Sequence, residues 1–207
     1  MCALLAVCVL LTACKEDKTN FNNDILFDTI HVVKAYNINN DSTQPSFNFS
    51  MDFVYPIHFA DTNVLHILQK EFNEIYLEDA SYRADSARVA IDKYLLKSTE
   101  SFKDDVKTYL SDVHSDTEET PTYLSSYDKF SGHILFNKNN LLSFQVERNI
   151  NKGKISFLSY RNYVFNLKTG DRLYEDDIFL PTFASEMSPL ILDKILKMNN
   201  VNSVKDL

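Results

Sequence analysis

The cysteines are the residues of this sequence whose type and position point most directly to a chemical reaction. Cys14 follows Leu11-Thr12-Ala13, and together they resemble a lipobox, the site where bacterial signal peptidase II cuts before a lipid-modified cysteine. Small side chains at positions 12 and 13 suit a narrow protease site, and the Cys14 thiol would be the nucleophile that takes up the diacylglycerol. Cys2 and Cys8 would leave with the signal peptide, so the mature chain would keep no thiol for a disulfide, a metal site or catalysis.

Other sequence patterns that carry enzymatic chemistry do not occur in this chain. The three glycines lie far apart, at positions 132, 153 and 170, which excludes a glycine-rich phosphate loop. The five histidines are scattered, without the i, i+4 pairing of a helical metal site, and no serine stands in a Gly-x-Ser-x-Gly elbow. We therefore expect no enzyme activity, no metal and no cofactor, although the sequence leaves open a pair of carboxylates that would process a glycan.

A candidate ligand surface is predicted in the last third of the chain. Tyr160 and Tyr163 stand in a strand-like stretch, where alternating aromatic residues either build a sheet core or line a groove for a glycan or a protein. Glu175, Asp176 and Asp177 form the densest acidic spot in the sequence. These acids either bind a cation or a basic ligand, or begin a short helical turn whose dipole they stabilise.

The N-terminal residues predict export and anchoring. Residues 1–13 carry no charge, fit the hydrophobic region of a signal peptide and are too few to span a membrane. The alternative, a buried N-terminal strand or helix, is disfavoured because the polar residues 15–20 cannot continue a core. We expect a signal peptide over 1–13, a tether over 14–24, and a lipid on Cys14 that attaches the protein to a bacterial membrane outside the cytoplasm, at the outer membrane or the cell surface.

The net charge and the composition limit the partners and the size of the fold. The formal net charge is −8, which argues against nucleic acid as a partner. Apolar residues make up 44% of the chain, so a sizeable core can form. A chain of 207 residues holds one large or two small domains.

Local patterns in the first half predict two strands followed by two helices. A strand is indicated over 30–36 by β-branched residues, and a second over 47–55 by apolar residues at alternate positions. Pro56 is expected to end or bend the second strand. The segment 61–63 offers several helix N-caps before an apolar helical face that runs from Val64 to Tyr76.

A longer helix and a boundary are predicted next. The apolar spacing predicts a helix over roughly 84–110, with 97–99 as the place where it would break. The polar stretch 111–122 ends in a proline-containing segment and is the best internal boundary. We expect an N-terminal α+β domain over 25–115 and a strand-rich domain over 120–207.

The second half is predicted to be rich in antiparallel strands. A hairpin joins 132–136 to 142–150 through an asparagine-rich turn, and 155–167 makes one long strand or two broken ones. A last helix is predicted over 189–198, with Leu190, Ile191, Ile195 and Met198 as its buried stripe. The order of strands, helices, strands and helix predicts an α+β fold with antiparallel sheets, two long helices in the N-terminal half and one helix in the C-terminal half.

The order of these motifs resembles a known extracytoplasmic family. The segments Asp52-Phe53-Val54-Tyr55-Pro56, Tyr163 to Leu173 and Asp176-Asp177-Ile178-Phe179 follow one another as in the paired domains of unknown function of RsiV-type anti-sigma factors. The same pair precedes the PdaC-type peptidoglycan deacetylase module and occurs in Bacteroidetes lipoproteins. The resemblance covers residues 25–207 and implies that the second domain continues past position 207, so we expect that domain to be incomplete here.

The departures from that family restrict what the resemblance implies. Family members often carry a Gly-Gly-Ala-His-Gly-like segment where this chain has residues 155–162, which contain neither glycine nor histidine. The transmembrane helix, the sigma-binding segment and the deacetylase module of the relatives are also missing from this sequence. We therefore expect a non-catalytic binding or sensing lipoprotein of the cell envelope, with lysozyme or peptidoglycan as the partner that the resemblance implies. An envelope glycan-processing enzyme with paired carboxylates and a structural or vestigial lipoprotein are the alternatives.

Overall fold

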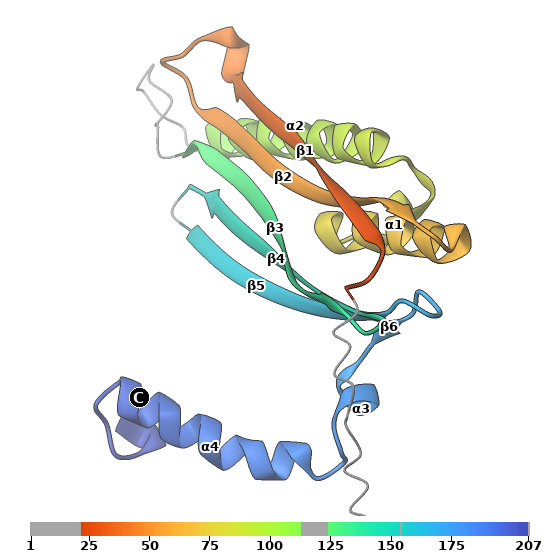
Figure 1. Ribbon diagram of the computed structural model, residues 1–207. Helices are drawn as coiled ribbons and strands as arrows, with labels where there is room; N and C mark the ends of the chain where they lie inside the picture. The colour runs from red at the N-terminus through yellow and green to blue at the C-terminus, as the bar shows by residue number, and fades with distance from the viewer. Residues whose placement is uncertain (1–21, 113–123, 154, 207) are drawn as a thin grey trace, which may run out of the picture.

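The computed structural model describes residues 22–112, 124–153 and 155–206, which form a sheet with two long helices on one face and two further helices beyond its edge (Figure 1). The α+β class predicted from the sequence is confirmed. The strands are β1 (Ile25–Asn37), β2 (Ser46–Phe59), β3 (Ser126–Lys138), β4 (Leu141–Lys152), β5 (Ile155–Asn166) and β6 (Arg172–Leu173). The helices are α1 (Thr62–Leu77), α2 (Ala87–Asp112), α3 (Glu175–Ile178) and α4 (Phe183–Met198), with short 3-10 turns at Ile38–Asn40, Ala80–Ala84 and Val204–Asp206.

The six strands lie in the sheet in the order in which they follow one another along the chain. All neighbouring strands are antiparallel except β2 and β3, which run parallel from the pair Phe47 and Ser126 to the pair Asp52 and Ser131. The parallel pair arises because α1 and α2 lie between β2 and β3 and carry the chain back to the other end of the sheet. The prediction of antiparallel sheets holds for the other four strand pairs.

Strand β2 runs beyond the proline at which the sequence predicted an end or a bend. The antiparallel register with β1 pairs Leu26 with His58 and Phe27 with Pro56, which leaves Ile57 as the extra residue of a bulge. On its other side, β2 pairs with β3 only as far as Asp52, so the missing N–H of Pro56 removes no hydrogen bond to β3. Pro56 therefore bends the strand at a bulge and does not end it.

The two long helices follow the local signals in the sequence. The Asp61 carboxylate caps α1 by accepting hydrogen bonds from the backbone N–H groups of Asn63 and Val64, at 2.9 and 3.2 Å. Helix α2 is continuous over its whole described length and does not break at 97–99. The Thr99 hydroxyl donates to the Leu95 carbonyl oxygen at 2.8 Å, so this polar side chain is satisfied within the helix.

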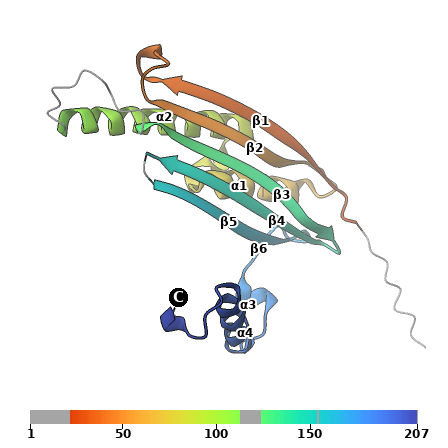
Figure 2. The same cartoon turned by 90° about the vertical axis from the view of Figure 1, so that its left-hand side faces the viewer.

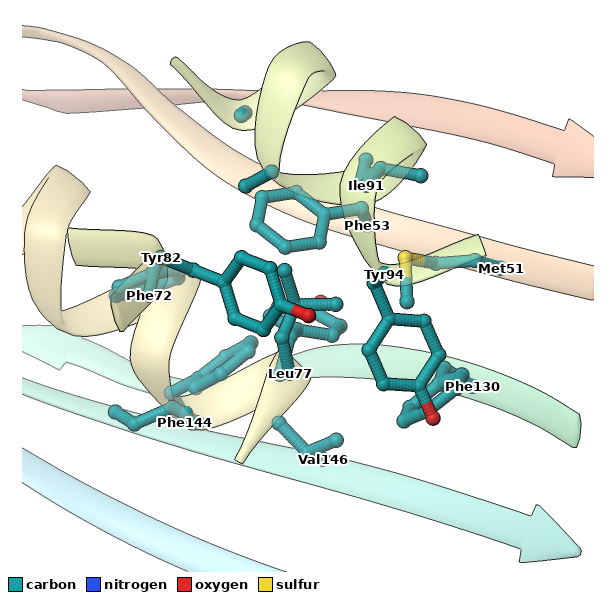
Figure 3. Close-up of a cluster of buried hydrophobic side chains, with 14 of the residues drawn as sticks. Met51, Phe53, Phe72, Leu77, Tyr82, Ile91, Tyr94, Phe130, Phe144 and Val146 are labelled. Atoms are coloured by element: carbon teal, nitrogen blue, oxygen red, sulfur yellow. The ribbon is translucent and has the colours of Figure 1, made fainter. Parts of the chain in front are cut away.

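The core lies between α1, α2 and one face of the sheet. Figure 2 shows the sheet from its open side, with α1 and α2 behind it. Aromatic rings dominate it, and the rings of Phe72 and Phe144 stack with centroids 4.4 Å apart. Figure 3 shows this cluster, with the rings of Tyr82 and Tyr94 beside each other, 6.4 Å between centroids. Gly132 makes room for Tyr76, because a Cβ atom at position 132 would lie 1.7 Å from the Tyr76 hydroxyl oxygen.

The hairpin between β3 and β4 forms at the predicted asparagine-rich turn. Asn139 and Asn140 adopt positive φ angles of 54° and 61°, the left-handed pair that a two-residue hairpin turn requires. Asn23, just before β1, holds the same turn: its side-chain oxygen accepts from the Asn140 N–H at 2.7 Å, and its amide donates to the Leu141 carbonyl oxygen at 2.9 Å. The beginning of the described chain is thus fixed to the tip of this hairpin.

The C-terminal helices differ from the prediction. Helix α4 begins at Phe183, six residues before the predicted start, and Pro189 lies inside it. No residue of α4 is buried, and α3 and α4 lie beyond the β6 edge of the sheet, away from α1 and α2 (Figure 1). The stripe predicted to be buried is exposed, at 63% for Leu190, 52% for Ile191, 41% for Ile195 and 72% for Met198. That prediction is wrong because an amphipathic pattern defines a helical face without defining its partner.

Several predicted segments lie outside the described residues. These are the signal peptide, Cys14, most of the tether and the boundary between the two predicted domains. Strands from the ranges of both predicted domains belong to one sheet, and the division at residues 115–120 stays a prediction. None of the helices in the described ranges is long and apolar enough to cross a membrane.

Candidate functional site

A cleft of about 520 Å³ lies between the second half of α2 and the adjoining ends of β3 and β4. It begins where α1 ends, at Leu77 and Glu78, so that only α2 covers this part of the sheet. Apolar and aromatic side chains form its walls, including Phe47, Tyr82, Phe102 and Ile150. Ser98, Ser101 and Asp105 of α2 line it as well.

The alternation of side chains along the strands places charged groups inside the cleft. In β4, Leu142, Phe144 and Val146 are buried on the helix-bearing face, and Arg148 is the next residue on that face. In β3, Asp128 lies two residues before the buried Phe130 and is itself only 6% exposed. The inner faces of β3 and β4 therefore change from apolar to charged at Asp128 and Arg148, within the cleft.

Arg148 is the centre of a buried hydrogen-bond network. Its Nε and Nη2 atoms bind the two carboxylate oxygens of Asp128 at 3.3 and 3.1 Å. Nη2 also donates to the Tyr94 hydroxyl oxygen at 2.7 Å, and the Tyr94 hydroxyl donates to Asp128 Oδ2 at 2.5 Å. Nη1 binds the carboxylate of Glu78. The guanidinium is thus held by side chains from α2, from β3 and from the residue that follows α1.

The environment fixes the charge states of Tyr94 and Arg148. Burial raises the pKa of the Tyr94 phenol above its usual value, and the charge of Asp128 raises it further. Burial by itself lowers the pKa of the Arg148 guanidinium, but the hydrogen bond to Asp128 and the nearby charges outweigh it, so that pKa lies above its usual value. Tyr94 therefore remains a neutral donor and Arg148 a cation at any physiological pH.

Glu78 forms the wall between the cleft and a second, smaller pocket. Glu78 follows the last residue of α1 and has a left-handed backbone, with φ 55° and ψ 29°, where glycine or asparagine is usual. One carboxylate oxygen binds Arg148, and the other binds Nη1 of Arg161 at 2.8 Å. The second pocket, about 210 Å³ in volume, is lined by Glu74, Ile75, Glu78, Arg161, Tyr163 and Arg172. The ion pairs hold Glu78 in a conformation that costs on the order of 1–2 kcal/mol for a residue with a Cβ atom.

Comparison with known proteins relates this architecture to solved structures. No protein-family model matches the chain, and no curated protein matches it in sequence. A DUF3298 family protein from Bacteroides fragilis is similar, with a TM-score of 0.77 and 18% sequence identity, over 90% of this chain and 73% of that one. The fold is DUF3298-like. A DUF3298 family protein from Pseudomonas aeruginosa is also similar, with a TM-score of 0.53 and 10% identity, over 89% of this chain and 72% of that one.

At these identities the likeness concerns the fold alone. The predicted family resemblance is supported as far as a DUF3298-like fold. The narrower resemblance to RsiV-type and PdaC-type proteins, and the pairing of two domains, stay predictions from the sequence.

The DUF3298-like fold separates the residues of the predicted ligand surface. Tyr160 and Tyr163 are three positions apart in an unbroken strand, so they lie on opposite faces of the sheet. Tyr160 is 55% exposed, whereas Tyr163 is 6% exposed and lines the second pocket. Across the described residues, no hydrogen bond or ion pair joins either tyrosine to Glu175, Asp176 or Asp177. Tyr160 and Tyr163 therefore belong to different surfaces, and ligand binding by the five residues stays a prediction from the sequence.

The acidic residues begin a short helical turn, which is one of the two arrangements that the sequence predicted for them. Glu175, Asp176 and Asp177 form the first turn of α3, a helix of one turn. The Asp177 carboxylate accepts a hydrogen bond from the Tyr174 N–H at 2.9 Å, which satisfies a backbone donor at the helix start. In the described part of the chain, no group of three or more His, Cys, Asp or Glu side chains is placed to hold a metal ion.

The sequence did not predict Arg148, Asp128 and Tyr94 as residues of a site, although the positions of Arg148 and Asp128 in their strands could have indicated it. Arg148 continues the alternating series of Leu142, Phe144 and Val146, and Asp128 precedes Phe130 at the same spacing. A charged residue on the apolar face of a predicted strand requires a partner in the core. No local pattern pointed to Tyr94, which reads as part of the apolar face of α2.

Proposed function

We propose that this protein is a lipoprotein of the bacterial cell envelope that binds peptidoglycan glycan in the cleft beside α2, without catalysis. The lipobox pattern before Cys14 and the polar tether support the location. The DUF3298-like fold is compatible with this role, and the binding of a glycan rests on the cleft itself.

The cleft is the observation that carries the proposal. Its volume of about 520 Å³ lies in the range of about 300–1,000 Å³ that is usual for small-molecule sites. Leu124 and Ile150, which line the cleft and are half-buried, offer apolar surface to the carbon faces of sugar rings, and the buried rings of Phe47, Tyr82 and Phe102 support them from behind. Ser101 and Asp105 offer groups that pair with sugar hydroxyls. A mostly apolar pocket with a few fixed polar groups is the arrangement that orients such a ligand.

The Arg148 network favours binding over bond cleavage. A general acid or base must exchange a proton with the substrate. The carboxylate oxygens of Asp128 accept hydrogen bonds from Arg148 and Tyr94, and those of Glu78 accept from Arg148 and Arg161. Carboxylates whose oxygens are occupied by cations in this way shape the floor of a site and have few free lone pairs left for a substrate.

The test uses chitotriose, a neutral oligomer of N-acetylglucosamine, as the probe. Ser101 is exposed and lines the cleft, so Ser101→Trp should fill the cleft and lower chitotriose affinity at least about tenfold in calorimetric titration. Ser111, exposed on the same helix and outside the cleft lining, provides the matched control Ser111→Trp, which should bind like the unaltered protein. Equal binding by the two tryptophan variants, or no binding by the unaltered protein, would refute the proposal.

A second candidate function is an envelope glycan-processing enzyme, because Glu78 and Asp128 present two carboxylates to one cleft. If this is the function, purified peptidoglycan incubated with the protein gains reducing ends, and Asp128→Asn abolishes the gain. The binding proposal predicts no such gain with either protein.

A lysozyme-like protein is the alternative occupant of the site. The net charge of −8 is complementary to a basic protein of that kind. A pull-down with immobilised lysozyme that recovers this protein, and loses it with Ser101→Trp but not with Ser111→Trp, would replace the glycan by a protein ligand in the same cleft.

A further inference from the structure

The second pocket, which we call the arginine pocket, adjoins the cleft and brings two guanidinium groups together. Arg161 lies two residues before Tyr163 in β5, on the helix-bearing face of the sheet. Arg172 in β6 pairs with Phe165, and directly opposite residues of a ladder share a face. Both arginines therefore project to the side that carries α1, at the edge of the sheet, where they line the pocket of about 210 Å³.

Aromatic rings hold the Arg172 side chain in place. Its guanidinium carbon lies 4.4 Å from the ring centroid of Tyr163 and 5.0 Å from that of Tyr174. Stacking of this kind uses the flat face of the guanidinium and leaves its N–H edges available for an acceptor. Because Tyr163 is buried at 6% exposure, one of the two rings is a fixed support. Arg172 is thus partly preorganised before any ligand arrives.

The carboxylates around the arginine pocket are bound to other cations. Glu74 forms an ion pair with Arg83, and Glu78 forms ion pairs with Arg148 and Arg161. Among the described residues, Arg172 has no carboxylate within ion-pair distance. The N–H edges of Arg172 are therefore the place in this pocket where an anion from outside would find an unoccupied donor.

We infer that the arginine pocket binds a carboxylate group of the ligand whose glycan lies in the cleft. The inference rests on the proposed function, since the cleft and the pocket meet at Glu78. A carboxylate matches the fork of N–H donors on a guanidinium. The formal charges of the two arginines and two glutamates in the pocket wall cancel, which favours a singly charged carboxylate over a doubly charged phosphate, and the small volume admits only the end of a ligand.

Two pairs of probes test the inference and separate the two sources of a carboxylate in peptidoglycan. The peptide source is represented by acetyl-D-alanyl-D-alanine and its C-terminal amide, and the sugar source by N-acetylmuramic acid and its methyl ester. We expect the acid of one pair to bind at least about tenfold more tightly than its neutral partner. The pair that shows this preference identifies the source.

The variant Arg172→Met should remove the preference for the acid, and the matched control is Arg88→Met, which removes an exposed arginine of α2 outside both pockets. A circular dichroism melt shows that each variant is folded. Three results would overturn the inference. The acid preference could persist in Arg172→Met, the acid and its neutral partner could bind equally, or neither acid could bind. Chitotriose carries no carboxylate, so its binding and its loss in Ser101→Trp test the proposed function independently of these outcomes.

Discussion

At the scale of single residues, Arg148 is the side chain on which the cleft depends. Its partners Asp128, Glu78 and Tyr94 come from β3, the end of α1 and α2, so one guanidinium joins three elements. The side chains of Arg148 and Asp128 are only 17% and 8% exposed. Transfer of such charges from water is costly, and the network is stable because hydrogen bonds compensate both groups.

The variant Arg148→Met should lower the free energy of unfolding by about 3–5 kcal/mol, because it leaves the Asp128 carboxylate buried without its cation. Urea denaturation followed by circular dichroism measures this value. Adding Asp128→Leu to Arg148→Met should recover part of the loss, since it removes the uncompensated charge. Arg88→Met is the control and should change the free energy by no more than about 0.5 kcal/mol. If Arg148→Met and Arg88→Met unfold at the same urea concentration, the network does not stabilise the fold.

At the scale of elements, the helices fall into two groups. Helix α1 buries Leu68, Phe72 and Tyr76 completely against the sheet, and α2 closes the core beside it. Helix α4 has an equally clear apolar stripe but no buried residue. Burial of apolar area against the sheet therefore stabilises α1 and α2 and contributes nothing to α4.

The exposed stripe of α4 predicts binding of a hydrophobic dye. The protein spanning residues 19–207 should enhance the fluorescence of anilinonaphthalene sulfonate, because Leu190, Ile191 and Met198 are more than half exposed. Replacing these three residues by glutamine should lower the fluorescence without shifting the urea midpoint. If the urea midpoint falls so far that the free energy of unfolding is lower by more than about 1 kcal/mol, α4 is packed against the sheet in solution.

At the scale of the whole molecule, the beginning of the described chain is fixed to the body and the expected anchor lies just before it. Asn23 is bound to the β3–β4 turn through its hydrogen bonds with Asn140 and Leu141. Residues 14–23 span at most about 35 Å when fully extended. A lipid on Cys14 would therefore keep the β3–β4 turn within this distance of the membrane surface, whereas the cleft lies at the opposite ends of β3 and β4.

The variant Cys14→Ser should move the protein from the membrane fraction to the soluble fraction of cells that express it. The residue precedes the first described strand in the sequence, so we expect the thermal melt of the purified variant to match that of the unaltered protein. Immunoblots of the fractions after a high-salt wash measure the distribution. A Cys14→Ser protein that stays with the membranes after this wash would contradict the lipid anchor.

The sequence by itself determined the local elements of this protein. The Asp61 cap, the apolar spacing of α1 and α2, the alternation in β2 and the asparagine turn between β3 and β4 all predicted what the structure contains. These features depend on side-chain periodicity and on backbone conformations a few residues long, which a sequence displays directly. The same periodicity predicted a buried stripe in α4 and was wrong there, because burial needs a partner as well as a pattern.

Only the tertiary structure decided where the candidate site lies. The parallel pairing of β2 with β3 places Phe49 opposite Asp128, although the two lie on either side of both long helices in the sequence. Arg148 binds Glu78, which lies 70 positions away in the sequence, and Tyr94, which lies 54 positions away. No local pattern encodes such contacts, because they follow from which strands become neighbours when the helices cover the sheet. The cleft exists because α1 ends at Leu77 while β3 and β4 continue beyond it.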